Sequence, residues 1–127
     1  MRWDHVAIKS ADIERSLHFY CGVLGLRKKE EVEILGKTFY FVGNESFSIE
    51  IEQGAPGEGR AQPRLQTGLY HVAFVVDDVA RIVEHVRSHG VSVVVEPVAT
   101  RPDRRVAFIE DPDGVLIQLI EFVSSGT

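Results

Sequence analysis

The chain has 127 residues, which is enough for one ordinary domain with a real hydrophobic core. Its 19 acidic and 14 basic side chains give a net charge of -5, which argues against the basic face of a general nucleic-acid-binding protein. No apolar run reaches the roughly 18 residues that a membrane-spanning helix needs, so we expect neither nucleic acid nor membrane as a partner. The single cysteine, Cys21, permits no intrachain disulfide, which fits a reducing cytosol and predicts a cytoplasmic protein.

The first half of the chain predicts one helix and four strands. Residues 3–9 alternate between apolar and polar side chains and favour a strand. Asp12 can cap the N-terminus of a helix, which Gly22 and Gly25 are predicted to end. The apolar stripe of this helix is Ile13, Leu17, Tyr20 and Leu24. Further strands are predicted near 27–34, 37–42 and 47–53, with turns at Leu35-Gly36 and Gly43-Asn44 between them.

The second half predicts the same order of elements. Residues 54–67 contain three glycines and two prolines and are predicted to form a linker. A strand at 69–77 precedes a helix that Asp78 caps and His89-Gly90 ends. The remaining strands are predicted near 91–97, 104–110 and 115–122, with a turn at Pro112-Asp113-Gly114 before the last of them.

The two halves are repeats of each other. His5 and His71 are 66 residues apart, and the two capping aspartates have the same offset. Glu50 and Gln118 are 68 residues apart, a drift that one small loop insertion explains. We therefore predict an α+β fold of two tandem βαβββ modules that form a curved eight-stranded mixed sheet. The expected organisation is a single domain over 1–127, composed of module 1 (1–53), the linker (54–67) and module 2 (68–123).

Four polar side chains occupy repeat-related places on otherwise apolar strands: His5, Glu50, His71 and Gln118. Taken alone, each has a structural explanation, because a strand histidine or glutamine often bonds to backbone and a strand glutamate is often solvated. Taken together, they are better explained by a divalent metal ion. Imidazole nitrogen and carboxylate oxygen are common ligands of such metals, and four protein ligands leave coordination positions for a substrate.

Four segments resemble the vicinal oxygen chelate superfamily, which includes glyoxalase I, methylmalonyl-CoA epimerase, extradiol ring-cleaving dioxygenases, fosfomycin resistance proteins and bleomycin resistance proteins. The segments are Asp4–Ile8, Phe19–Leu26, His71–Phe74 and Phe108–Gly114. The resemblance implies the glyoxalase/bleomycin resistance/dioxygenase fold, a small-molecule substrate and a homodimer. It also implies one divalent metal ion, which could be Zn, Ni, Co, Mn or Fe.

The resemblance carries the family's metal positions to His5, Glu50, His71 and Gln118. Glutamine at the last position is a departure, because glyoxalase I, the epimerase and the dioxygenases generally have glutamate there. The set matches that of the epimerase with the two halves exchanged.

The implied activity is a glyoxalase I-like lyase or an epimerase-like isomerase that transfers a proton through a metal-chelated enediolate. Glu50 would be both ligand and catalytic base, because the amide of Gln118 cannot accept the proton. Lys9 and Arg105 are candidate contacts for a substrate anion.

Other functions stay open at this point. Two histidines and one carboxylate also suit iron(II) in an extradiol-type dioxygenase, although Gln118 replaces a usual carboxylate. A metal-free, bleomycin-resistance-like binding protein is a further alternative. His5 and His71 argue against it, because such proteins lack the metal ligands. Thiol transfer of the fosfomycin resistance type is another possible activity, and Gln118 makes this hypothesis less favoured as well.

Overall fold

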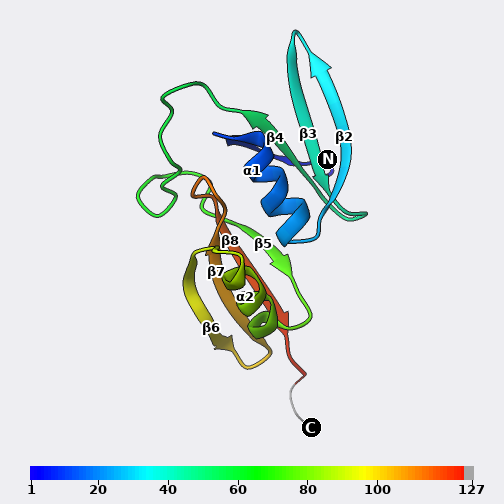
Figure 1. Cartoon of the computed structure of the whole chain (residues 1–127). Coiled ribbons are helices and arrows are strands. Elements are labelled where there is room, and N and C mark those ends of the chain that lie inside the picture. The colour runs from blue at the N-terminus through cyan, green and yellow to red at the C-terminus, as the bar shows by residue number, and fades with distance from the viewer. Residues whose placement is uncertain (125–127) are drawn as a thin grey trace. The chain divides into compact units, whose positions relative to one another are not determined.

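The computed structural model describes residues 1–124, and the chain forms two compact units that divide between Gly59 and Arg60. The first unit contains β1 (Val6–Ser10), α1 (Ile13–Leu17), η1 (His18–Val23), β2 (Arg27–Ile34), β3 (Lys37–Gly43) and β4 (Ser48–Gln53). The second unit contains β5 (Val72–Val75), α2 (Val79–Ser88), β6 (Val93–Arg101), β7 (Arg104–Glu110) and β8 (Leu116–Phe122). Each unit follows the βαβββ order that the repeat predicts (Figure 1).

Each unit contains its own mixed sheet. The strand orders are β1-β4-β3-β2 and β5-β8-β7-β6, so the first strand of each unit pairs with the last. That pairing is parallel, and the other pairings are antiparallel. The α+β class and the two modules are confirmed. The hydrogen-bonded ladders of residues 1–124 are complete within each unit, so they form two four-stranded sheets where the sequence predicts a single sheet of eight.

The two predicted helix caps are confirmed. The Asp12 carboxylate accepts from the backbone N–H of Arg15 at 3.2 Å, and the Asp78 carboxylate accepts from that of Arg81 at 3.0 Å.

The end of the first helix differs from the prediction. The chain widens after α1 into η1, a π-helical turn in which the Leu24 N–H donates to the Phe19 carbonyl. Gly22 therefore lies inside this turn and does not end the helix. Gly25, with a φ of +78°, follows η1 as predicted.

One face of each sheet packs against the helix of its own unit. On β4, Ile49 and Ile51 are buried on that face, whereas Glu50 alternates with them and lies on the other face. On β8, Ile117 and Leu119 are buried in the same way, and Gln118 lies between them. Burial of each such aliphatic side chain contributes about 1.5–3 kcal/mol, so the apolar positions determine which face the polar ones occupy.

β1 and β5 both begin three residues later than predicted. Their registers begin at Val6 opposite Ile49 and at Val72 opposite Ile117, where the partner strands have themselves just begun. The residues before Val6 and Val72 therefore have no partner residue in the β1–β4 and β5–β8 registers. The two repeat-related histidines, His5 and His71, are therefore the last residues before their strands.

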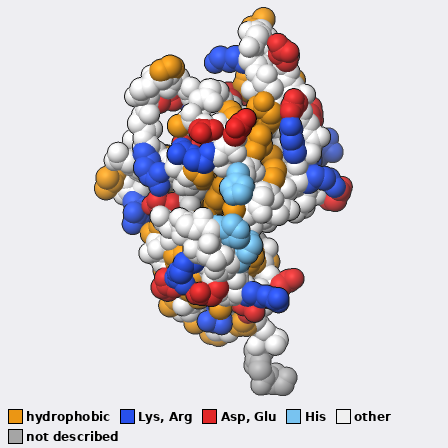
Figure 2. Space-filling view, in the orientation of Figure 1, with side chains coloured by type: hydrophobic (Ala, Val, Ile, Leu, Met, Phe, Trp, Pro, Cys, Tyr) orange, Lys and Arg blue, Asp and Glu red, His pale blue; other side chains and the backbone are white. Residues whose placement is uncertain are grey.

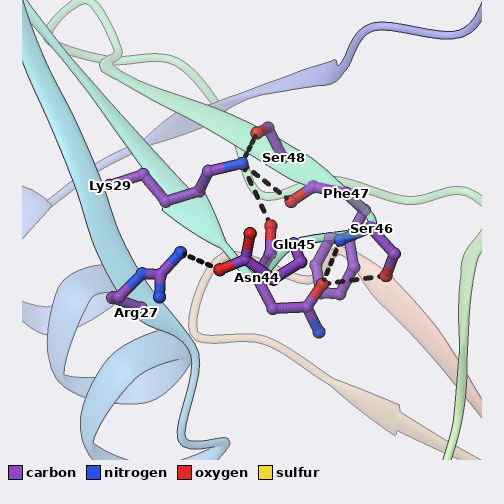
Figure 3. Close-up of polar contacts among 7 residues, drawn as sticks. All are labelled: Arg27, Lys29, Asn44, Glu45, Ser46, Phe47 and Ser48. Atoms are coloured by element: carbon purple, nitrogen blue, oxygen red, sulfur yellow. Dashed lines mark hydrogen bonds and ion pairs between the residues drawn. The ribbon is translucent and has the colours of Figure 1, made fainter.

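A lysine of β2 forms hydrogen bonds to the loop that connects β3 and β4. A bulge between Lys28 and Glu30 leaves Lys29 outside the ladder. Its ammonium group donates to the Ser48 hydroxyl at 2.7 Å and to the Asn44 carbonyl at 3.1 Å (Figure 3). These bonds hold the loop that leads into β4 and hence into Glu50.

Charged side chains of both signs are interspersed on the face of the molecule drawn in Figure 2. Among residues 1–124, no helix is both long enough and apolar enough to cross a membrane.

Gly43 and Gly36 provide a matched test of this connection. A Cβ atom on Gly43 would lie 2.2 Å from the Phe47 carbonyl oxygen, whereas one on Gly36, with a φ of +81°, would meet nothing within 4 Å. We expect Gly36→Ala to lower the free energy of unfolding by about 1 kcal/mol through backbone strain alone. Gly43→Ala should lower it by roughly 3 kcal/mol, because the loop must also move. Urea denaturation measures both values, and equal losses would contradict this view of the loop.

Candidate metal centre

In the first unit, a histidine and a carboxylate face each other. His5 immediately precedes β1, and Glu50 lies in β4 opposite Ala7. His5 Nε2 is 3.2 Å from Glu50 Oε2, and the side chains are 32% and 18% exposed. The pair is therefore partly shielded from water but still accessible from outside the unit.

The other ring nitrogen of His5 contacts Asp4. Nδ1 lies 2.6 Å from Asp4 Oδ2. A carboxylate only accepts hydrogen bonds, and the contact at Nδ1 is the shorter of the two, so Asp4 favours the neutral tautomer with its proton on Nδ1 and its Nε2 lone pair toward Glu50. In that tautomer two electron-rich atoms face each other, and a shared cation satisfies both.

The second unit repeats the backbone placement of this pair, with an amide in place of the carboxylate. His71 immediately precedes β5, and Gln118 lies in β8 opposite Ala73. His71 Nδ1 is buried and has no hydrogen-bond partner. An unpartnered buried nitrogen is costly, which sets this position apart from an ordinary core histidine.

A phenylalanine packs against each of these histidines. Phe41 makes an edge contact with the His5 ring at 5.4 Å between centroids, and it lies opposite Glu50 in the register. Phe108 makes the same contact with His71 at 5.3 Å, and it lies opposite Gln118. This pair of phenylalanines was not predicted from the sequence. Its signal was available, because the two phenylalanines are 67 residues apart, between the repeat offsets of 66 and 68.

The atoms of the first pair fit two neighbouring ligands of one divalent metal ion. Metal–ligand bonds of roughly 2.1 Å at right angles place the two ligand atoms roughly 3 Å apart, close to the observed separation of His5 Nε2 and Glu50 Oε2. Among residues 1–124, no group of three or more His, Cys, Asp or Glu side chains is arranged to hold a metal. Each unit thus supplies two of the four predicted ligands.

Lys9 lies on the same sheet face as Glu50. It pairs with Glu52 in the parallel register and borders a cavity of about 550 Å³ in the first unit. The other charged residues that line this cavity are Lys37, Glu52 and Glu58. Lys9 Nζ is 3.3 Å from Glu58 Oε1. The Ala55 N–H and then the Lys9 ammonium hold the pKa of the Glu58 carboxyl below its ordinary value.

Arg105 lies on the opposite sheet face from Gln118. It pairs with Glu121 in the register and so shares the face of Ala107, which packs against the helix. Strand alternation is the reason, because positions of odd number in β7 face α2. Arg104 lies on the face of Gln118 instead, and its guanidinium group is 4.7 Å from the centre of the Phe122 ring. The structure thus does not bring the predicted anion contact Arg105 to the face of Gln118.

Comparisons with known proteins identify the family of the chain. The family model of the Glyoxalase/Bleomycin resistance protein/Dioxygenase superfamily matches residues 2–119. A lactoylglutathione lyase of Escherichia coli O157:H7 is 35% identical over 131 residues, which cover 99% of this chain and 96% of that protein. A probable lactoylglutathione lyase of Synechocystis sp. is 34% identical over 124 residues, which cover 92% of each chain.

The solved structure of glyoxalase I from Zea mays superimposes with a TM-score of 0.82 and 25% identity, covering 97% of this chain and 45% of that one. The chain belongs to the Glyoxalase/Bleomycin resistance protein/Dioxygenase superfamily, as an enzyme of the glyoxalase family.

Proposed function

We propose that the protein is a metal-dependent lyase of the glyoxalase I type. Its substrate is the hemithioacetal that a 2-oxoaldehyde forms with a thiol such as glutathione. The reaction removes the proton from the hemithioacetal carbon and returns a proton to the adjacent carbon, so that a 2-hydroxy thioester results without an external oxidant or reductant. The full-length similarity to two lactoylglutathione lyases supports this substrate class.

The proposed metal ligands are His5, Glu50, His71 and Gln118. The observation that carries the proposal is the His5–Glu50 pair, whose facing atoms are 3.2 Å apart. The equivalent placement of His71 and Gln118 in the second unit supports the other two ligands. When bound, a divalent metal supplies Lewis-acid stabilisation of the negative charge that develops on the substrate oxygens.

Glu50 is the proposed base. It is the only one of the four ligands with a carboxylate, and the equivalent residue of the second unit is an amide. Its side chain is 18% exposed, so little water competes for the substrate proton there. The same carboxylate returns the proton to the neighbouring carbon. Gln118 then serves as a neutral ligand only.

Lys9 is the proposed contact for a carboxylate of the thiol portion. It lies on the Glu50 face and borders the cavity of about 550 Å³, which has room for a small peptide-like group. Its ion pair with Glu58 is exposed, so a substrate carboxylate can replace Glu58 at little cost. From the family resemblance we also expect the protein to form a homodimer.

Epimerisation of a 2-carboxyacyl thioester such as methylmalonyl-CoA is a second candidate, because Gln118 completes the ligand types of the epimerase with the halves exchanged. Parallel assays with methylglyoxal hemithioacetal and with methylmalonyl-CoA separate the two reactions. We expect turnover of the hemithioacetal, and turnover of methylmalonyl-CoA alone would replace the first proposal by the second.

Replacing Glu50 tests the base. Glu50→Gln keeps an oxygen ligand but removes the proton acceptor, so we expect kcat to fall by about 10²–10⁴-fold. Gln118→Glu restores a family carboxylate and should keep metal binding. Steady-state kinetics with methylglyoxal hemithioacetal, alongside elemental analysis of each variant, give the answer. Full activity of the Glu50→Gln variant would remove Glu50 from this role.

Metal removal tests the cofactor. The protein purified without chelator should contain close to one divalent metal ion per pair of modules, and dialysis against a chelator should abolish turnover. Activity should return with at least one of Zn²⁺, Ni²⁺, Co²⁺, Mn²⁺ or Fe²⁺. Unchanged turnover after complete metal removal would show that the reaction does not need the proposed centre.

Replacing Lys9 tests the anion contact. Lys9→Met removes the ammonium group while keeping most of the aliphatic stem, so KM for the hemithioacetal should rise about tenfold with kcat little changed. Lys28→Met is the control, because it removes an exposed lysine of β2 from outside the cavity. Equal KM values for the two variants would show that Lys9 does not bind substrate.

A further inference from the structure

The two candidate histidine ligands have unlike partners at their Nδ1 atoms. His5 Nδ1 donates to Asp4 Oδ2 at 2.6 Å. His71 Nδ1 is buried and has no partner, and the residue equivalent to Asp4 at the repeat offset of 66 is Tyr70. The Tyr70 ring instead contacts the edge of the His71 ring at 5.0 Å between centroids.

This difference affects which nitrogen of each ring carries the proton and which has a lone pair for a cation. A neutral imidazole that coordinates through Nε2 must hold its proton on Nδ1, and an acceptor for that proton fixes both the tautomer and the ring orientation. Asp4 supplies such an acceptor to His5. The same tautomer of His71 would leave a buried N–H without an acceptor, which is unfavourable.

Asp4, which accepts the hydrogen bond from His5, can affect a bound metal only through the His5 ring. The Asp4 side chain is 91% exposed, so it contributes little to the packing of the first unit. It is not one of the four proposed ligands, and it contacts Nδ1 of His5.

We propose that Asp4 is a positioning residue of the metal centre, and that the second module lacks its counterpart because Tyr70 occupies that place. This inference rests on the proposed function, since it requires His5 and His71 to bind the metal. Metal affinity then depends on Asp4, and it can be increased by giving His71 the acceptor that it lacks.

Metal affinity itself is the readout. Wild-type protein and variants are freed of metal and titrated with Zn²⁺ in competition with a chromophoric chelator. Removing an outer carboxylate partner of a ligating histidine weakens metal binding by roughly 10–100-fold. Because Asp4 is exposed, we expect about a tenfold increase in Kd for Asp4→Ala. Asp4→Asn keeps an acceptor oxygen without the charge and should fall between Asp4→Ala and wild type.

Two further variants complete the experiment. Tyr70→Asp places a carboxylate next to His71 and should lower Kd for Zn²⁺ several-fold. Glu33→Gln removes an exposed carboxylate of β2 and controls for the change in net charge. Thermal unfolding of the metal-free proteins should show the same midpoint for wild type and the Asp4 variants.

The outcomes separate this inference from the proposed function. Wild-type protein that binds no Zn²⁺ would overturn both. Wild-type protein that binds Zn²⁺ with the same Kd as Asp4→Ala would overturn only the role of Asp4. Unchanged or weaker binding by Tyr70→Asp would overturn the explanation for His71.

Discussion

The separation of 3.2 Å between His5 Nε2 and Glu50 Oε2 depends on the parallel pairing of β1 with β4. A slip of one residue in β4 would turn Glu50 toward the helix and bring Ile49 or Ile51 to the outer face. The burial of those two isoleucines against α1 therefore protects the polar contact, although neither touches it. Lys29 and Gly43 hold the loop before β4 and so define where the strand begins.

The two units present the same framework with different chemistry. The first places ionisable groups around its histidine, namely Asp4 and Glu50. In the second, the His71 ring contacts Tyr70 and Phe108, and the amide Gln118 stands at the repeat position of Glu50. Under the proposed function, proton transfer falls to the first unit, and the second contributes neutral ligands. A divalent metal with one carboxylate ligand keeps a net positive charge, which favours a substrate oxygen that becomes negative during the reaction.

Much of the fold could be predicted because its signals are local. Asp12 and Asp78 cap helices through bonds to residues three positions ahead, and the Leu35-Gly36 turn follows from two residues with positive φ. The π-helical turn of η1 could not be predicted, because Gly22 reads as a helix end in a pattern based on a period of 3.6 residues. The late starts of β1 and β5 depend on where their partner strands begin, which no local pattern shows.

The candidate site was predictable only in part for the same reason. Glu50 stands out as a polar residue in an apolar strand and His5 as a polar residue next to one, and the repeat links them to the second unit. Charge alone does not reveal which face of β7 Arg105 occupies, whereas the register with Glu121 does, and its role as an anion contact stays a prediction. Asp4 carries no signal as a single exposed acid before a strand, and its importance appears only with the Nδ1 contact.

Binding of one metal ion by both repeat-related pairs can be examined by anomalous diffraction from crystals grown with Zn²⁺. We expect one strong peak whose protein ligands are an imidazole nitrogen from each of His5 and His71, a carboxylate oxygen of Glu50 and the amide oxygen of Gln118. A Zn²⁺ ion bound without Glu50 and either histidine, or bound only at surface sites elsewhere, would contradict it.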